Sequence, residues 1–199
     1  MHRTFAAHAR KLWEPETVPV APEVTVGIMG MGVLGRACAG ALRGMGYNVI
    51  GWSRTPKHFD EVQSFDGLEG LEKFLPRTQI LVCLLPLTEE TEGILGRGTF
   101  NRLPAGAAVI NAGRGAHMVE EDLLKALERG KIEVAVLDVF NEEPLPVDNP
   151  LWDHPRVFIT PHTASVTTPE SAIISVADAI EELRKGLPFS NLVSLELGY

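Results

Sequence analysis

The 199-residue sequence has only two cysteines and no long apolar run, and each absence excludes a class of protein. Cys38 and Cys83 cannot build a disulfide framework, and the apolar stretch around each is typical of a small buried side chain. Because no apolar run reaches the length of a membrane span, no membrane partner is expected. Residues 1–13 contain basic but no acidic side chains, yet they lack the serine richness of a transit peptide. They fit an amphipathic helix, and the expected setting is cytoplasmic.

An excess of positive charge is also absent. The chain has 18 Lys and Arg residues against 26 Asp and Glu residues, which gives a formal net charge of −8. A nucleic-acid surface needs a basic face, so nucleic acid is not an expected partner. A small anionic ligand is still compatible, because Arg54, Lys57 and Arg114 can act locally within an acidic molecule. With 45% hydrophobic and 22% charged residues, the composition is that of one soluble domain with a small appendage.

Short apolar runs alternate with helical patterns along most of the chain. Strands are expected over residues 24–28, 47–52, 79–85, 107–111, 132–138 and 157–160. Helices are expected over residues 1–13, 33–45, 68–75, 120–128 and 169–185, with an extended connector over residues 14–23. This alternation predicts an α/β fold of the Rossmann type, a doubly wound parallel sheet with helices on both faces. We expect a linker helix and connector at 1–23, a dinucleotide-binding domain at 24–168, and a C-terminal helix and tail at 169–199.

Sheets of this kind bind ligands beyond the carboxyl ends of their strands. The turn at Gly30 and the loops that hold Asn111, Asp138 and Pro161 each follow an expected strand. Because the carboxyl ends of parallel strands share one edge of the sheet, these four loops should converge on one rim.

A glycine-rich turn, residues 30–35, has the pattern G-x-G-x-x-G between an expected strand and an expected helix. The bare pattern is a weak signal, but this context is typical of a dinucleotide site. Gly30 permits the tight turn, Gly32 lets a pyrophosphate approach the backbone, and Gly35 lets helix and strand pack closely. The pyrophosphate would lie at the helix N-terminus, where free N–H groups favour anions. The alternative is a tight turn without a ligand.

The end of the second expected strand indicates which dinucleotide is bound. An NAD-binding fold commonly has Asp or Glu here to accept the ribose 2′-hydroxyl. This chain has Ser53 instead, followed by Arg54, Thr55 and Lys57. A hydroxyl and cations suit a 2′-phosphate that a carboxylate would repel, so the sequence favours NADP over NAD. The alternative is that Arg54 and Lys57 form a solvated basic turn.

Arg114 lies between two glycines in residues 111–115, directly after an expected strand. The guanidinium group presents a rigid fork of donors that fits a carboxylate. The rim position favours a substrate-binding role over the commoner fate of arginine, a surface ion pair.

Glu143 and His162 complete the set of reactive side chains. Pro144 restricts the backbone after Glu143, and His162 follows Pro161 at the end of the last expected strand. A neighbouring carboxylate favours the protonated ring and holds one tautomer, so His162 could donate a proton to a substrate oxygen. His117 and His154 are rival candidates, but neither has such a framework in the sequence.

Taken together, these motifs resemble those of the D-2-hydroxyacid dehydrogenases, most closely the glyoxylate/hydroxypyruvate reductase A branch. The likeness is carried by residues 30–35, 51–54, 85–88, 111–115, 138–144, 149–157, 161–162 and 198–199. It implies reduction of a small 2-oxo acid by NADP(H), with NAD(H) as the second choice, no metal, and a homodimer formed through the cofactor domain.

The resemblance also implies a role for each matching residue. Arg114 would bind the substrate carboxylate, His162 would be the acid/base, and Glu143 would be its partner. The cofactor residues would be, from the pyrophosphate to the adenosine phosphate, Gly30, Gly32, Val33, Leu34, Gly35, Ser53, Arg54, Thr55 and Lys57. Those along the cofactor path and near the nicotinamide would be Leu85, Pro86, Thr88, Ala112, Asp138 and Ala164.

One departure is large, because members of the family place most of a substrate-binding domain before the segment that Met1–Trp13 resembles. The chain is therefore expected to be a fragment, a sequence with a wrongly assigned start, or a lone cofactor domain, with little activity by itself. The apolar residues of the tail would then lose part of their packing partner: Phe189, Leu192, Val193, Leu195 and Leu197. The alternative to a reductase is an NADP-binding dimeric module without turnover.

Overall fold

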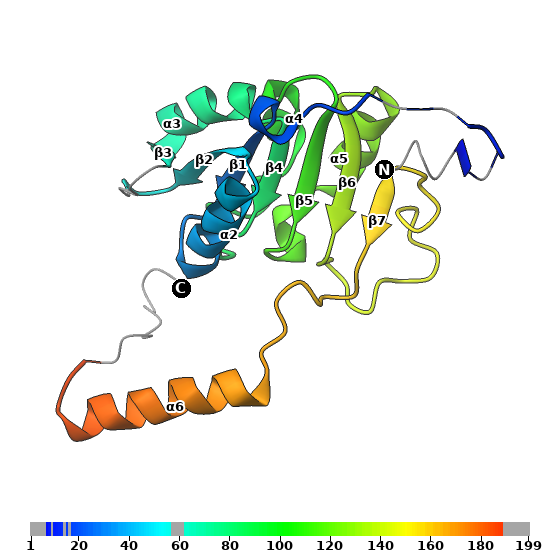
Figure 1. Cartoon of the computed structure of the whole chain (residues 1–199). Coiled ribbons are helices and arrows are strands. Elements are labelled where there is room, and N and C mark those ends of the chain that lie inside the picture. Colours follow the sequence, from blue (N-terminus) through cyan, green and yellow to red (C-terminus); the bar gives the residue numbers. More distant parts are fainter. Residues whose placement is uncertain (1–6, 9, 14, 16, 57–61, 189–199) are drawn as a thin grey trace.

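The computed structural model describes residues 7–8, 10–13, 15, 17–56 and 62–188. Seven strands form one sheet in the order β3-β2-β1-β4-β5-β6-β7, and every neighbouring pair is parallel (Figure 1). The strands are β1 (Thr25–Met29), β2 (Asn48–Ser53), β3 (Gln63–Asp66), β4 (Ile80–Cys83), β5 (Ala107–Asn111), β6 (Ile132–Leu137) and β7 (Val157–Ile159). The predicted Rossmann-type α/β class is confirmed.

The α-helices connect these strands and continue beyond the last one. They are α2 (Val33–Gly44), α3 (Gly67–Phe74), α4 (Arg97–Arg102), α5 (Glu120–Glu128) and α6 (Pro169–Arg184). All six predicted strands are present, as are the four helices predicted after residue 30, with ends that differ by one or two residues at most. In α6, Pro169 lies in the first turn and the Thr168 hydroxyl accepts a hydrogen bond from the Ser171 N–H, as suits a helix start.

The strand β3, the helix α4 and three short 3-10 turns, Ala21–Glu23, Leu75–Arg77 and Gly115–His117, were not predicted; the first of these turns interrupts the expected extended connector. In β3 only Phe65 is apolar and buried, and in the six-residue α4 only Phe100 is. A single apolar residue gives no periodicity, so local sequence could not distinguish either element from a loop. Of β3 and α4, β3 matters for the site, because it leads into α3, and α3 contributes to the wall of the main cavity.

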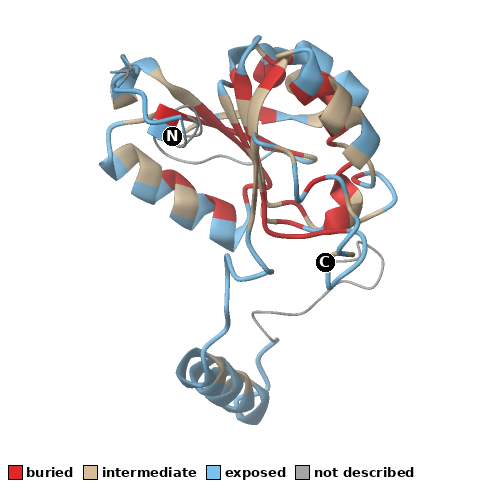
Figure 2. Ribbon diagram, turned by 90° about the vertical axis from the view of Figure 1, so that its right-hand side faces the viewer, coloured by how far each residue is buried: buried red, intermediate tan, exposed pale blue. Residues whose placement is uncertain are grey.

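The core has one part on each face of the sheet. The larger part contains Phe74, Phe100 and Leu127 from α3, α4 and α5, and the smaller part contains Ala39 from α2. Figure 2 shows the buried residues concentrated along the sheet and the inner sides of these helices. Cys83 is fully buried, as expected, and burial raises the pKa of its thiol to about 12. Cys38 is only half-buried, so its interpretation as a buried side chain was wrong.

The two ends of the described chain differ from the prediction. The helix expected over residues 1–13 does not reach Trp13, because Ala7 and His8 are helical but Arg10 and Lys11 form a turn. Trp13 is 97% exposed, so it does not pack on the sheet of its own chain. Phe5 and the apolar tail residues from Phe189 onward lie outside the described residues. Helix α6 stands apart from the sheet and has no buried residue (Figures 1 and 2).

Candidate active site

The glycine turn joins β1 to the start of α2 and is closely packed on one side only. Gly30 has a φ of +102°, and a Cβ there would lie 2.5 Å from the Leu84 carbonyl oxygen. A Cβ on Gly35 would lie 2.0 Å from the Gly30 carbonyl oxygen, so helix and turn are in contact. A Cβ on Gly32 would meet nothing within 4 Å, and no side chain caps the helix start. The turn therefore presents open backbone at Gly32, with the first turn of α2 behind it.

A cavity of about 470 Å³ lies beside this turn, at the carboxyl ends of β1, β2 and β4. It brings together eight residues expected to hold the cofactor: Gly30, Gly32, Ser53, Arg54, Thr55, Leu85, Pro86 and Thr88. Val33 and Leu34 are exposed in the first turn of α2. Ala112, Asp138 and Ala164 do not line the cavity; they lie in the loops after β5, β6 and β7. Lys57 lies outside the described residues.

The end of the cavity beyond β2 contains hydroxyl and charged groups. The buried Ser53 hydroxyl donates to the Thr55 carbonyl oxygen at 2.8 Å. The Arg54 guanidinium forms an ion pair with Glu90 at 2.8 Å, and both side chains line the cavity. The Glu90 side chain is 66% exposed, and exposed pairs of this kind contribute little to stability. A phosphate entering the cavity could therefore replace Glu90 as the partner of Arg54 at small cost.

Sequence reasoning missed several residues of the cavity wall. Glu90 and Thr91 come from the loop after β4, and Leu68 and Leu71 come from α3. The Thr91 hydroxyl donates to the Pro86 carbonyl oxygen and accepts from the Thr88 N–H, each at 2.8 Å. The spacing of the two threonines, three residues apart, is a signal for such a hydroxyl-stabilised turn. Glu90 gave no signal, because acidic residues in a surface loop are common.

The loop after β5 holds Arg114 by its backbone. The Asn111 amide donates to the Arg114 carbonyl oxygen at 3.1 Å, and its oxygen accepts from the Gly113 N–H at 3.2 Å. A Cβ on Gly115 would lie 1.9 Å from the Phe140 carbonyl carbon, so this loop touches the loop after β6. The exposed Arg114 side chain donates to the Gly113 carbonyl oxygen at 2.7 Å. That bond leaves most of its five N–H donors available to an anion.

Glu143 and His162 form a hydrogen-bonded pair. The Glu143 carboxylate lies 2.8 Å from the His162 Nδ1, and its other oxygen accepts from the Phe140 N–H at 2.9 Å. The hydrogen bond from His162, followed by the one from Phe140, lowers the pKa of the Glu143 carboxyl. The carboxylate therefore stays ionised at neutral pH and holds Nδ1 in its protonated state. The other ring nitrogen, Nε2, has no hydrogen-bond partner among the described residues and is available to a ligand.

Asp138 shapes the loop that carries His162. Its carboxylate accepts from the Thr160 hydroxyl at 2.5 Å and from the Thr163 and Ala164 N–H groups at 2.9 Å each. Its backbone oxygen accepts from the His162 N–H, and His162 has a φ of +54°. Burial raises the pKa of the Asp138 carboxyl, but these hydrogen bonds outweigh it and leave the pKa below its ordinary value. Asp138 thus holds a backbone conformation that is uncommon for a residue other than glycine.

Replacing Asp138 by asparagine should destabilise the chain at neutral pH by about 1–3 kcal/mol, because an amide cannot accept all three hydrogen bonds. The folded-state pKa lies below the unfolded value of about 3.9, so the carboxylate stabilises the fold fully above about pH 4. That contribution is lost as the pH falls through the folded-state pKa. Urea unfolding at pH 7 and pH 3 should show a difference between wild type and variant that shrinks in acid. An equal difference at both pH values would contradict this account, and Asp148→Asn, at an exposed position, is the control.

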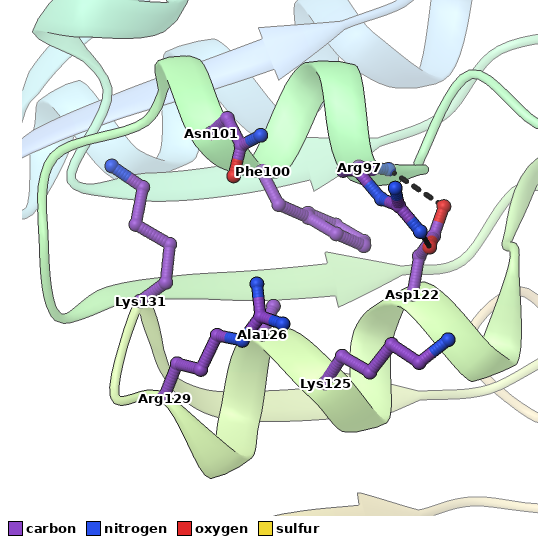
Figure 3. A pocket seen from close by; sticks show the side chains of 8 residues that line it. All are labelled: Arg97, Phe100, Asn101, Asp122, Lys125, Ala126, Arg129 and Lys131. Atoms are coloured by element: carbon purple, nitrogen blue, oxygen red, sulfur yellow. Dashed lines mark hydrogen bonds and ion pairs between the residues drawn. The ribbon is translucent and has the colours of Figure 1, made fainter.

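A second hollow, of about 170 Å³, lies between α4 and α5 (Figure 3). Its lining is basic, with Arg97, Lys125, Arg129 and Lys131 against a single carboxylate, Asp122. The Arg97 N–H and guanidinium both donate to Asp122, and the Lys131 ammonium donates to the Leu103 carbonyl oxygen. None of the predicted cofactor or catalytic residues lines this hollow, and we assign it no ligand.

The described part of the chain has neither a metal-binding cluster nor a membrane-spanning helix. No group of three or more His, Cys, Asp or Glu side chains there is placed to hold a metal ion. No helix among the described residues has the length and apolar character needed to cross a membrane.

Comparison with known proteins identifies the family. Residues 2–164 match the family of the D-isomer specific 2-hydroxyacid dehydrogenase, NAD binding domain. A glyoxylate/hydroxypyruvate reductase A from Yersinia enterocolitica is 47% identical over 190 residues, which cover 96% of this chain and 61% of the relative. The chain thus spans about 61% of that relative's length.

Solved structures give the same result. A D-isomer specific 2-hydroxyacid dehydrogenase from Xanthobacter autotrophicus Py2, in complex with NADPH and MES, is 41% identical with a TM-score of 0.95, covering 100% of this chain and 82% of that one. An NADPH-dependent glyoxylate/hydroxypyruvate reductase from Sinorhizobium meliloti, in complex with NADP and sulfate, is 41% identical with a TM-score of 0.92, covering 100% of this chain and 64% of that one. The chain therefore belongs to the D-isomer specific 2-hydroxyacid dehydrogenases and matches their NAD-binding domain.

Proposed function

We propose that this chain is the cofactor-binding part of an NADPH-dependent reductase that converts a small 2-oxo acid, glyoxylate or hydroxypyruvate, to the 2-hydroxy acid. The observation that carries the proposal is that the candidate site residues lie along one rim of the sheet. The carboxyl ends of β1, β5, β6 and β7 there carry the glycine turn, the loop of Arg114 and the Glu143–His162 pair. The names of the relatives from Yersinia and Sinorhizobium support the same activity.

The residues of the cavity fit NADP(H). Open space at Gly32 and the uncapped start of α2 suit a pyrophosphate, and Arg54 and Ser53 at the far end suit a 2′-phosphate. The bound nucleotide would supply the hydride. Leu85 and Pro86 would line its path, and Asp138, Ala112 and Ala164 would lie near its nicotinamide end.

Arg114 and His162 would act on the oxo acid. The Arg114 fork would bind the carboxylate and orient the neighbouring carbonyl. His162 would donate the proton from Nε2 to the carbonyl oxygen as negative charge develops there. The Glu143 carboxylate would stabilise the charged ring before the transfer and keep the remaining proton on Nδ1 afterwards.

The first test concerns the choice of cofactor, because it needs only the 199-residue chain. NADPH should bind more tightly than NADH, and Arg54→Ala should remove most of the difference. The expected loss is about 1–3 kcal/mol, roughly 5- to 150-fold, for a charge-assisted contact with the 2′-phosphate. Isothermal titration calorimetry with both nucleotides measures it.

The matched control for that experiment is Arg102→Ala. Arg102 is an exposed arginine of α4 that does not line the cavity, so its removal should leave both affinities unchanged. Equal affinities of the wild-type chain for NADPH and NADH would contradict the assignment of Ser53 and Arg54 to a 2′-phosphate.

Other expectations from the sequence stay predictions. These are the homodimer, the cytoplasmic setting, the three-part division of the chain, and the low activity of the chain alone. An NADP-binding dimeric module without turnover is the second candidate. Sedimentation of the purified chain checks the dimer, and an assay of that chain with NADPH and glyoxylate checks its low activity. The same assay of a chain that also carries the N-terminal segment of a relative distinguishes a reductase from a module without turnover.

A further inference from the structure

His117 is a fully buried histidine that the proposed reaction does not use. It ends the 3-10 turn Gly115–His117, which directly follows Arg114, and none of its surface is exposed. Its ring is held by two backbone groups from different loops. Nδ1 lies 3.0 Å from the Arg114 backbone nitrogen, and Nε2 lies 3.2 Å from the Pro86 carbonyl oxygen.

These two partners determine the protonation state of the ring. A backbone N–H can only donate, so Nδ1 must accept from Arg114. A carbonyl oxygen can only accept, so Nε2 must carry the proton and donate to Pro86. A charged ring would place an Nδ1 proton against the Arg114 N–H. Burial, the largest cause, lowers the pKa of His117 and outweighs the hydrogen bond to the Pro86 carbonyl oxygen, which acts in the opposite direction. His117 is therefore a neutral bridge and is unsuited to proton donation.

The bridge joins two parts of the candidate site. Pro86 lines the cavity assigned to the cofactor, and the Arg114 side chain is assigned to the substrate carboxylate. The Arg114 carbonyl oxygen is also held, by the buried Asn111. A Cβ on Gly113 would lie only 2.9 Å from the His117 Nδ1, so the ring fits tightly against this loop. The backbone of Arg114 thus has little freedom to move independently of His117.

We propose that His117 is a positioning residue that couples the Pro86 wall of the cavity to the backbone of Arg114. A nucleotide packed against Pro86 would fix that carbonyl, and through the imidazole it would restrict the Arg114 loop before the oxo acid arrives. The inference rests on the proposed function, because it takes the cavity as the cofactor site and Arg114 as the carboxylate site. His117 does not line the cavity and would itself touch neither ligand.

Two conservative variants separate the two halves of the bridge. An asparagine amide reaches about as far as Nδ1, so His117→Asn keeps an acceptor for Arg114 and loses the bond to Pro86. A glutamine amide reaches about as far as Nε2, so His117→Gln keeps a donor for Pro86 and loses the acceptor for Arg114. Each variant is the control for the other, because both place a polar side chain of similar size in the same buried site.

The experiment follows hydrogen exchange of the Arg114 amide by NMR in the 199-residue chain. The probe is the 2′-phosphorylated ADP-ribose part of NADP, which lacks the nicotinamide ring that would lie near Arg114. In wild type, the probe should slow Arg114 exchange. In His117→Gln without the probe, exchange should be about 5- to 10-fold faster because a hydrogen bond is lost. In His117→Asn, exchange without the probe should stay near wild type, but the slowing by the probe should disappear.

A measurement on wild type alone keeps the proposal testable if both variants unfold. Imidazole ¹⁵N shifts should report a neutral Nε2–H tautomer for His117 at pH 7, and an Nδ1–H tautomer or a charged ring would overturn the bridge. Equal slowing by the probe in wild type and His117→Asn would overturn the coupling alone. Failure of wild type to bind the probe in calorimetry would overturn the cofactor assignment and the coupling together.

Discussion

Replacing His162 by alanine should lower the turnover of glyoxylate by about 10²–10⁴-fold, the usual contribution of a positioned proton donor. The affinity for NADPH should change little, because His162 does not line the cavity beside the glycine turn. The ring has the geometry that donation requires: Nδ1 is paired with the ionised Glu143, and Nε2 has no partner among the described residues.

Stopped-flow oxidation of NADPH measures the effect in a chimaera in which the N-terminal segment of a curated relative precedes this chain. The family resemblance implies that this segment is most of a substrate-binding domain, which would exclude water and orient the oxo acid. Glu143→Gln keeps an acceptor for Nδ1 but removes the charge, so it should cause a smaller loss than His162→Ala. A His162→Ala chimaera that retains turnover within a few-fold of the unsubstituted one would show that the proton comes from another group.

Replacing Gly35 by alanine should destabilise the fold by about 3 kcal/mol, at the upper end for an overpacked position. The added Cβ would lie 2.0 Å from the Gly30 carbonyl oxygen, and neither backbone segment is free to move. Gly30 is itself packed against the Leu84 carbonyl group and has a positive φ that an L side chain rarely adopts. Urea unfolding followed by circular dichroism measures the loss.

Gly32→Ala is the matched variant. It should leave the stability of the fold unchanged but weaken the binding of NADPH. The backbone there has a φ of −81° and a ψ of −158°, which alanine adopts readily, and the new Cβ would meet nothing within 4 Å. Stability should therefore stay within about 0.5 kcal/mol of wild type. The affinity for NADPH should fall by the roughly 1–3 kcal/mol of an overpacked contact, because the methyl group would stand where the pyrophosphate approaches. Unchanged NADPH affinity in this variant would contradict the assignment of the pyrophosphate to the backbone at Gly32.

The sequence was most informative where a local pattern allows only one structural interpretation. The glycine turn, the strand ends and the loops of Arg114 and His162 could be predicted, because each combines a short apolar run with residues that suit a turn. The pairing of Glu143 with His162 was expected from the family resemblance and is present in the structure at 2.8 Å. The separation of 19 positions between the two residues carries no such information by itself.

What could not be predicted depends on tertiary contacts. Phe65 in β3 and Phe100 in α4 are single apolar residues whose burial is decided by distant parts of the chain. Glu90 becomes a partner of Arg54 only because the loops after β2 and β4 meet across the cavity. The bridging role of His117 could not be predicted, because its partners are backbone groups and every residue type except proline offers the same backbone groups.

The hydrogen bonds that Asp138 accepts from the loop after β7 also set a mechanical boundary in the chain. The last of them reaches Ala164, and every residue from there to the start of α6 is exposed. A force or a displacement applied through α6 would therefore be taken up in residues 165–168, before it reaches His162. Residues 165–168 therefore separate the position of α6 from the Asp138 hydrogen bonds that hold the loop of His162.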